Sequence, residues 1–324
     1  MSELHKFIFE GLPVRGHLVR LTDGWRELLQ RRAGAAGTGQ AWPGPVCALM
    51  GEMTAAAVLM QANIKFDGAL TLQVFGDGPV KLAVAEVQAD LSFRATAKVI
   101  GGVEPGDHFA QLLNLHGAGR CAITLDPGAT PVGRAPYQGV VALSDAQGHA
   151  LPTLSSVLEH YMRQSEQLET RLMLAADEHL AAGLLIQRLP VEGSANLGAS
   201  GGVDDAAPNE AFSRIAHLTA TLTRGELLSL DPTTLLRRLY WEEPLRRFEA
   251  ADAAPRFECR CSRGRVGRMM QGLGRAEIDD ILAEQGHVEV ACEFCALRYR
   301  FDSVDVGELF TPVRDQMPPT AAIN

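Results

Sequence analysis

The chain has 324 residues, of which 46% are apolar, and this is enough for two domains with a sizeable core. Its formal net charge of −9 argues against nucleic acid or an anionic membrane as the main partner, because phosphate groups bind to clustered positive charge. Residues 1–10 hold no long apolar run, and no stretch approaches the roughly 18 consecutive apolar residues of a spanning helix. We therefore expect a cytoplasmic protein without a secretory signal.

The first part of the sequence alternates between strand and helix patterns. Strands are predicted at Lys6–Glu10 and Val14–Leu21, and helices at Trp25–Arg32 and Val46–Met60. The Gly/Ala/Pro-rich Ala33–Pro45 between these helices is predicted to be a loop. Five later segments are rich in strand-forming residues, namely Leu70–Phe75, Val80–Val87, Ser92–Val99, Arg120–Leu125 and Gln138–Leu143.

A capped helix and two more strands follow. Thr153 can cap a helix over Leu154–Ser165, and strands are predicted at Arg171–Ala176 and Leu180–Leu189. Because the strands cluster in hairpins rather than alternating one by one with helices, the pattern favours an α+β fold over a doubly wound parallel sheet. We expect a sandwich-like N-terminal core domain over residues 1–190.

The next segment has the composition of a linker. Val191–Pro208 is rich in Gly, Ala and Ser and is predicted to be flexible. Two amphipathic helices are predicted after it, one over Asn209–Leu228 and one that starts at Asp231-Pro232 and runs through Tyr240. Neither helix is long enough to be stable without a surface to cover. We therefore treat residues 191–250 as a flexible to helical linker.

The C-terminal part, residues 251–324, is predicted to be a small separate module. A helix is expected at Arg275–Glu284, and Gly286 suits its end. Strands are expected at Val288–Ala291 and Arg298–Phe301, joined by a turn that carries two cysteines. The patterned part of this module, residues 256–310, has about 55 residues, and a chain of that size buries only about 60% of the surface of its unfolded form, so its apolar core is marginal.

Four of the six cysteines lie in this module as two close pairs. Cys259 and Cys261 are separated by one residue, Cys292 and Cys295 by two, and the pairs stand 31 positions apart (292 − 261). Such pairs can converge on one tetrahedral zinc ion with four thiolate ligands. The other two cysteines, Cys47 and Cys121, stand alone in apolar surroundings and are predicted to be buried thiols.

The spacing of the first pair indicates more than a structural role. Structural zinc sites usually have two to four residues between paired cysteines, whereas Cys259 and Cys261 have one. Upon oxidation each pair could close on itself, and a disulfide across a single residue would be strained and therefore labile. Zinc cannot stay once its sulfurs are paired. Since structural zinc contributes roughly 10–16 kcal/mol in small modules, its loss should unfold this one.

Other interpretations of the four cysteines stay open at this point. A catalytic zinc is disfavoured because four thiolates leave no open position, and His287-Val-Glu289 lies too close to Cys292 for a zinc deaminase. A zinc-ribbon module that binds RNA or protein would use the arginines around Cys259–Arg268. A thiol–disulfide oxidoreductase would use Cys292 and Cys295 but lacks the expected βαβ context. No Walker A pattern is present, so ATP binding by a P-loop is not expected.

The sequence resembles the 33-kilodalton heat-shock chaperones of bacteria, which are redox-regulated holdases. The resemblance runs through most of the chain, and its specific part is the set of C-terminal cysteines. It is carried by Phe7-Ile-Phe-Glu, Val14-Arg-Gly-His-Leu-Val, Gly51-Glu-Met-Thr-Ala-Ala-Ala, Tyr137-Gln-Gly-Val-Val, Tyr161-Met-Arg-Gln-Ser-Glu-Gln-Leu, Ala181-Ala-Gly-Leu-Leu-Ile-Gln, Leu236-Arg-Arg-Leu-Tyr and Cys292-Glu-Phe-Cys-Ala-Leu-Arg-Tyr-Arg-Phe. Two stretches depart from the family pattern and look like loop extensions, Ala33–Trp42 and Ser194–Gly202.

The resemblance implies a chaperone that is not an enzyme. In the reduced, inactive state one zinc per chain would be held by Cys259, Cys261, Cys292 and Cys295. Oxidation would pair Cys259 with Cys261 and Cys292 with Cys295, release the zinc and disorder the linker. The oxidised protein would form a homodimer and hold unfolding client proteins without ATP, and neither nucleic acid nor a membrane would be a partner.

Overall fold

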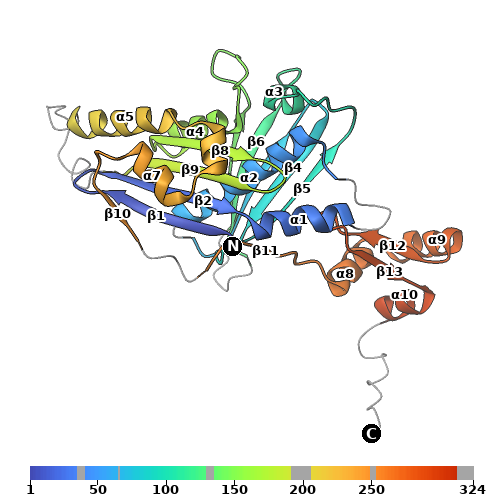
Figure 1. The fold of residues 1–324 in the computed structure, drawn as a ribbon. Coiled ribbons are helices and arrows are strands. Elements are labelled where there is room, and N and C mark those ends of the chain that lie inside the picture. Colours follow the sequence, from blue (N-terminus) through green and yellow to red (C-terminus); the bar gives the residue numbers. More distant parts are fainter. Residues whose placement is uncertain (35–40, 65, 129–134, 191–205, 249–252, 312–324) are drawn as a thin grey trace, which may run out of the picture. The chain divides into compact units, whose positions relative to one another are not determined.

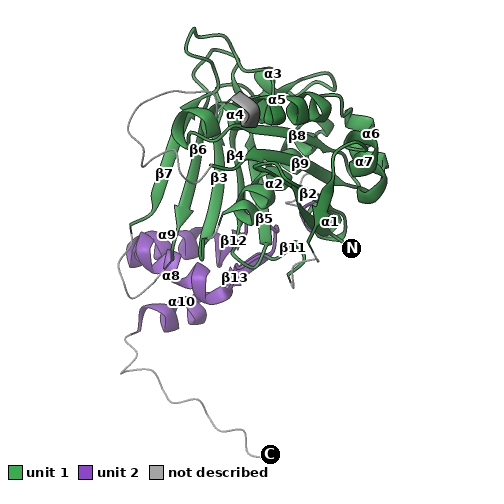
Figure 2. Cartoon of the chain, turned by 90° about the vertical axis from the view of Figure 1, so that its left-hand side faces the viewer, with its two compact units in different colours: residues 1–30, 41–258 green, residues 31–40, 259–324 purple. Residues whose placement is uncertain are grey.

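The computed structural model describes residues 1–34, 41–64, 66–128, 135–190, 206–248 and 253–311. The chain divides into two compact units, shown in Figure 2. Unit 1 comprises residues 1–30 and 41–258, and unit 2 comprises residues 31–40 and 259–324. The predicted α+β class is confirmed, whereas the three-part division at residues 190 and 250 stays a prediction. The extension at Ser194–Gly202 lies outside the described residues, as do residues 35–40 of the extension at Ala33–Trp42.

Unit 1 contains two β-sheets. The first has the strand order β10-β1-β2-β9-β8, all antiparallel. Its strands are β1 (Glu3–Phe9), β2 (Val14–Leu21), β8 (Thr170–Ala176), β9 (Ala181–Arg188) and β10 (Leu245–Arg247). The predicted strands are thus confirmed to within a few residues. The three-residue β10 was missed because it owes its geometry to pairing with the distant β1.

The second sheet of unit 1 has the strand order β11-β5-β4-β3-β6-β7. Its strands are β3 (Ala69–Phe75), β4 (Val80–Val87), β5 (Ser92–Val99), β6 (Arg120–Asp126), β7 (Tyr137–Ala142) and β11 (Arg256–Phe257). Neighbouring strands are antiparallel except β11, which pairs in parallel with the start of β5. The segment just before the first cysteine pair is therefore one of the two edge strands of this sheet.

Helix α2 (Gly44–Asn63) is the central element of unit 1 and contacts strands of both sheets (Figure 1). Gly51 allows its close approach, because a Cβ there would lie 2.3 Å from the Cβ of Ala176. By length and composition α2 could cross a membrane, which the sequence reading had not noticed. However, 78% of the 18-residue apolar stretch of α2 is buried inside the protein, which is typical of a core helix.

The remaining helices of the N-terminal part are α1 (Asp23–Gly34), α3 (Phe109–Leu113) and α4 (Leu154–Ser165). Helix α4 begins as predicted, because the Thr153 hydroxyl accepts a hydrogen bond from the backbone N–H of Ser156. The short α3 was not predicted. Helix α1 extends to Gly34 and therefore includes the first two residues of the predicted loop, Ala33 and Gly34.

The linker segment forms α5 (Ala206–Ala220), α6 (Arg224–Ser229) and α7 (Pro232–Leu239). The prediction of a single helix over Asn209–Leu228 is wrong. The chain breaks at residues 221–223, where Thr223 starts a new helix by exchanging hydrogen bonds with Glu226 in a capping box. Helix α7 starts as predicted, since Asp231 accepts from the N–H groups of Thr233 and Thr234.

Unit 2 is built from short elements around a small core. They are α8 (Arg263–Leu273), α9 (Arg275–Gln285), β12 (Val288–Ala291), β13 (Arg298–Phe301) and α10 (Ser303–Phe310). Strands β12 and β13 form an antiparallel hairpin, as predicted, and Gly286 ends α9 with a left-handed φ of 73°. Helices α8 and α10 were missed.

Candidate metal centre

The four C-terminal cysteines meet in unit 2. Cys259 and Cys261 lie in the segment that leads into α8, and Cys292 and Cys295 lie in the turn between β12 and β13. All four Sγ atoms lie within 4.8 Å of one another. Cys295 is buried, while the other three are half-buried and so within reach of small oxidants. The spacing thus predicted a convergence that the structure confirms.

The geometry fits a tetrahedral ion bound to sulfur. Zinc–sulfur bonds of about 2.3 Å place neighbouring sulfurs about 3.8 Å apart at tetrahedral angles. The Sγ of Cys259 is 3.6 Å from that of Cys292, and the Sγ of Cys261 is 3.4 Å from that of Cys295. In the part of the chain that the structure describes, this is the sole group of three or more cysteine, histidine or acidic residues arranged for a metal.

The turn between β12 and β13 shapes the second half of the site. The N–H of Cys292 donates to the carbonyl of Leu297 at 2.9 Å, and the N–H of Ala296 donates to the carbonyl of Cys292 at 2.7 Å. The N–H groups of Phe294 and Cys295 point at the sulfur of Cys292, and the N–H of Leu297 at the sulfur of Cys295. Such backbone donors stabilise thiolates, which are the form that binds a metal.

The sulfurs of Cys259 and Cys292 form one coupled titrating pair. Their mutual hydrogen bond raises the pKa of Cys259 and lowers the pKa of Cys292, so the two thiols hold a single shared proton near neutral pH. A divalent cation would displace that proton, since bound cysteine is a thiolate. Burial raises the pKa of Cys295 to about 11, so this thiol too would lose a proton when a metal binds.

Tyr299 is a residue of this site that the sequence reading missed. It lies on β13, and its phenol oxygen is 3.1 Å from the Sγ of Cys261. The contact spans 38 positions of sequence and depends on how the hairpin faces the first cysteine pair. Its position four residues after Cys295 was the available signal.

Comparison with known proteins agrees with this geometry. The family model described as Hsp33 protein matches residues 2–302. The 33 kDa chaperonin of Chromobacterium violaceum is 41% identical over 95% of this chain and 94% of its own length, and that of Methylobacillus flagellatus is 39% identical over 96% and 94%. The chain belongs to the Hsp33 family. A chaperone role follows from this membership, and the relatives are named as chaperonins rather than as enzymes.

The fold agrees with the Hsp33 family as well. The crystal structure of the 33 kDa chaperonin from Thermotoga maritima superimposes with a TM-score of 0.70 and covers 95% of this chain and 97% of its own. The two sequences are 18% identical, so this likeness speaks for the fold alone.

Two arginines near the metal centre in the sequence of this Hsp33-family chain, Arg263 and Arg298, bind carboxylates within unit 2. Arg263 pairs with Asp305 at 2.6 Å and stacks over the ring of Phe301 at 4.1 Å, and Arg298 pairs with Glu289 at 2.9 Å. These contacts hold α8, α10 and the β12–β13 hairpin together. The arginines thus build the scaffold of the sulfur cluster.

The two isolated cysteines are buried thiols, as predicted. Burial raises the pKa of Cys47 to about 11 and that of Cys121 to about 12, so both stay protonated near neutral pH. Since the thiolate is the reactive form, neither competes with the C-terminal cluster for oxidants.

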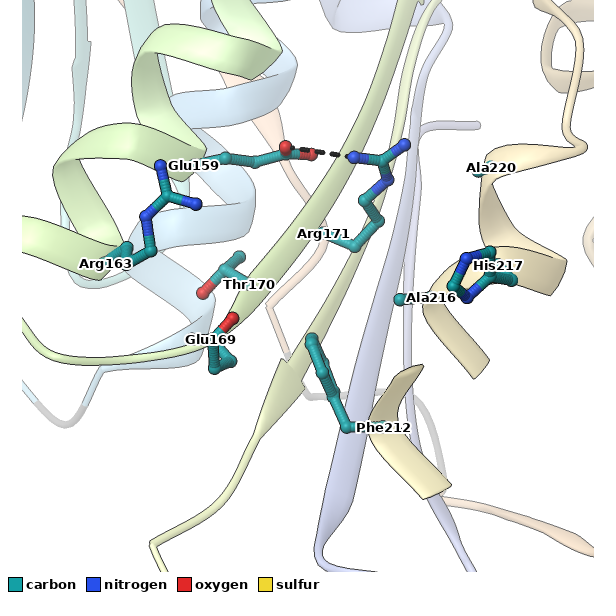
Figure 3. Close-up of a pocket in the computed structure, with 9 residues that line it drawn as sticks. All are labelled: Glu159, Arg163, Glu169, Thr170, Arg171, Phe212, Ala216, His217 and Ala220. Atoms are coloured by element: carbon teal, nitrogen blue, oxygen red, sulfur yellow. Dashed lines mark hydrogen bonds and ion pairs between the residues drawn. The ribbon is translucent and has the colours of Figure 1, made fainter. Parts of the chain in front are cut away.

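Unit 1 holds a polar pocket of about 260 Å³ that contains no cysteine (Figure 3). It lies where α5 of the linker meets β8 and α4. Glu159 and Arg171 form an ion pair across it at 3.3 Å, and Glu159 also accepts the N–H of Leu172 at 2.8 Å. Phe212 and His217 line it from α5. The side chains of α5 therefore leave a space between this linker helix and the surface formed by β8 and α4.

Proposed function

We propose that this protein is a redox-regulated, ATP-independent holdase chaperone of the cytoplasm. In the reduced state one zinc ion per chain would be held by Cys259, Cys261, Cys292 and Cys295, and the protein would be inactive. Oxidation to the disulfides Cys259–Cys261 and Cys292–Cys295 would release zinc and expose a surface for unfolding client proteins and for a homodimer partner. The observation that carries the proposal is the convergence of four half-buried to buried sulfurs in a unit with a very small core.

The core of unit 2 is too small to be stable unaided. Its cluster of fully buried residues has five members, Met270, Ile278, Val288, Phe301 and Val306. A fully buried apolar side chain contributes about 1.5–3 kcal/mol, so five supply roughly 7–15 kcal/mol before the entropy of ordering the chain is subtracted. A bound zinc adds roughly 10–16 kcal/mol. Release of the metal is therefore expected to unfold unit 2.

In unit 1 the linker helices cover one face of the five-stranded sheet. Ile215 and Leu235 of the linker are buried in one apolar cluster with Leu18 and Ile186 of the sheet. The ring of Tyr240 packs edge-on against Phe9 with centroids 5.0 Å apart. Removal of the linker would expose apolar residues on both surfaces, and such surfaces bind apolar segments of other proteins.

Charged side chains hold helix α6 at both ends. At its C-terminal end the guanidinium of Arg20 on β2 donates to the carbonyls of Leu227, Leu228 and Leu230 at 2.9, 3.2 and 2.7 Å. At its N-terminal end Arg224 pairs with Glu52 of α2 at 3.2 Å and also donates to the carbonyl of Ala176. The linker is therefore docked through a few specific contacts in addition to its apolar stripe.

The linker and the metal centre are joined by a short path along the chain. Strand β11 follows the linker and is held at the edge of β5, where Phe257 packs against Phe93 and the N–H of Glu258 donates to the carbonyl of Phe93 at 3.0 Å. Cys259 is the next residue. Disorder that begins at Cys259 would therefore reach β11 first and the linker next.

Aggregation of a thermally unfolded client protein tests the proposal. The reduced, zinc-loaded protein is expected to leave aggregation unchanged, and the same protein treated with peroxide under mild heating is expected to suppress it without ATP. Zinc released per chain is measured in parallel and should approach one. An oxidised protein that has lost its zinc and still fails to suppress aggregation would refute the proposed function.

A further inference from the structure

The hydroxyl of Tyr299 links the two halves of the sulfur cluster. Tyr299 lies opposite Val290 in the β12–β13 hairpin, whose turn supplies Cys292 and Cys295. Its oxygen is 3.1 Å from the sulfur of Cys261, which belongs to the other cysteine pair. The side chain of Tyr299, on the hairpin that carries Cys292 and Cys295, thus contacts the sulfur of the other cysteine pair.

The phenol must be the donor in this hydrogen bond when Cys261 binds a metal. A metal-bound cysteine is a thiolate and has no proton to give. The O–H group of Tyr299 then points at a negative sulfur, and hydrogen bonds to an ionised acceptor are about twice as strong as neutral ones. Hydrogen bonds from the surrounding protein tune the reactivity of metal ligands.

Cys261 differs in this respect from the second cysteine pair. Cys292 and Cys295 receive hydrogen bonds from backbone N–H groups of their own turn, as described above. Those donors persist as long as the turn persists. The hydroxyl of Tyr299 is a side-chain donor to Cys261, so its contribution can be removed by deleting one atom.

We propose that Tyr299 is a positioning residue that restrains Cys261 and thereby sets how much oxidant is needed to close the Cys259–Cys261 disulfide. The lone pair of Cys261 that accepts the hydrogen bond from the phenol cannot attack an oxidant until that hydrogen bond breaks. Whether this restraint matters for control of the chaperone depends on the proposed function. The contact of Tyr299 with Cys261 and its effect on the reactivity of the sulfur are independent of that function.

A peroxide is the oxidant that the restraint would oppose. The thiolate of Cys261 attacks the O–O bond, one oxygen goes to sulfur as a sulfenic acid, and the other leaves as hydroxide. The thiolate of Cys259 then attacks that sulfur, the S–S bond forms, and a second hydroxide leaves. Two electrons pass from the sulfur pair to the peroxide, and two protons from solvent convert the hydroxides into water.

The size of the effect follows from how nucleophilicity depends on basicity. Thiolate attack rates rise with the basicity of the sulfur with a Brønsted coefficient of about 0.4–0.5, so a tenfold gain in basicity speeds attack about threefold. Loss of one charge-assisted hydrogen bond is expected to produce a change of at least that order.

The test compares Tyr299→Phe with Tyr137→Phe, which loses the same atom in unit 1, where the hydroxyl lies 3.4 Å from Glu166. Both zinc-loaded variants and the parent protein are mixed with hydrogen peroxide, and free zinc is followed with a chromogenic chelator. In a second measurement, iodoacetamide labelling of Cys261 is followed by mass spectrometry. We expect zinc release and Cys261 labelling both to be about threefold or more faster in Tyr299→Phe than in the parent protein. The two rates of Tyr137→Phe should equal those of the parent. Equal or slower rates for Tyr299→Phe would overturn the proposal.

A second variant covers the case in which Tyr299→Phe binds less than one zinc per chain. 3-Fluorotyrosine placed at position 299 keeps the shape and makes the hydroxyl a stronger donor, so labelling and zinc release should both slow. Unchanged rates there would equally refute the restraint. Failure of the parent protein to suppress aggregation would count against the proposed function only, because labelling of Cys261 needs no chaperone activity.

Discussion

The two units of this protein differ in the size of their apolar cores and in their content of clustered sulfurs. Unit 1 has a long core helix between two sheets, with side chains such as Trp25 and Met53 fully buried. Unit 2 buries five residues in its main cluster and adds four sulfurs that can share one ion. If the sulfurs of unit 2 hold zinc as proposed, this difference predicts that an oxidant unfolds unit 2 and leaves unit 1 folded.

The largest expected effect is the loss of unit 2 when a sulfur is removed. Cys292→Ser should bind far less than one zinc per chain, because the hydroxyl is a poor zinc ligand, and amides of unit 2 should exchange with solvent without protection while those of unit 1 stay protected. Zinc analysis and hydrogen exchange measure this. Cys47→Ala is the matched control and should keep its zinc. A Cys292→Ser protein with one zinc per chain would contradict the claim that unit 2 depends on this sulfur for metal binding.

The next effect sharpens the role of the linker within unit 1. Ile215 lies on the buried face of α5, whereas Ser213 on the same helix is exposed. Ile215→Asp would place an unpaired charge in the apolar cluster, which costs several kcal/mol, so the linker should detach. The reduced Ile215→Asp protein should then suppress client aggregation without oxidant, and Ser213→Asp should not. An inactive reduced Ile215→Asp protein with an exposed linker would show that the linker is not the inhibitory element.

A smaller change should loosen helix α6 alone. The side chain of Arg20 is 14% exposed and donates to three carbonyls at the end of this helix. Hydrogen bonds that involve a charged group contribute about 1.5–3 kcal/mol, so Arg20→Gln should speed hydrogen exchange at residues 227–230 about tenfold or more. Arg26→Gln, which removes an exposed guanidinium, is the control. Equal exchange in both variants would mean that the Arg20 contacts do not hold the linker.

The last expected effect, of similar size, is a pH dependence confined to unit 1. Burial, together with the charges of Lys6 and Arg15, lowers the pKa of His17 to about 3. A lowered pKa in the folded state means that His17 contributes its full stability above pH 6.5 and loses it as the pH falls toward 3. At pH 5 the loss is about 2 kcal/mol, since each unit corresponds to about 1.4 kcal/mol.

Urea unfolding of unit 1 at pH 7.5 and pH 5 measures this loss. His17→Gln should lose about 2 kcal/mol less than the parent protein between the two pH values. His179→Gln, at a side chain that is 76% exposed, should behave as the parent does. An identical pH dependence in all three proteins would show that His17 does not become charged upon unfolding.

The sequence predicted the elements whose signals are local. Alternating apolar residues located β2, and Thr153 and Asp231 marked helix starts that the structure confirms. Strands β10 and β11 were missed because two or three residues carry no periodic signal and take their shape from a partner strand far along the chain.

Helix α8 shows why local patterns were insufficient in unit 2. Its sequence Arg-Gly-Arg-Val-Gly-Arg-Met-Met-Gln-Gly-Leu contains three glycines, which disfavour a helix. It forms because Ser262 caps its first turn and Gly267 lets Leu309 of α10 approach, where a Cβ would lie 2.6 Å from the Leu309 side chain. The cysteine spacing predicted where the sulfurs converge, but the contact of Tyr299 with Cys261 depends on this tertiary packing.

The central claim is that the state of four sulfurs controls the order of the linker. Hydrogen exchange of the zinc-loaded protein, sampled during peroxide treatment together with free thiols and bound zinc, tests it most directly. The account predicts that four thiols and one zinc are lost per chain while protection at residues 206–240 falls in step and the sheets of unit 1 stay protected. Complete loss of thiols and zinc with unchanged protection at residues 206–240 would contradict it.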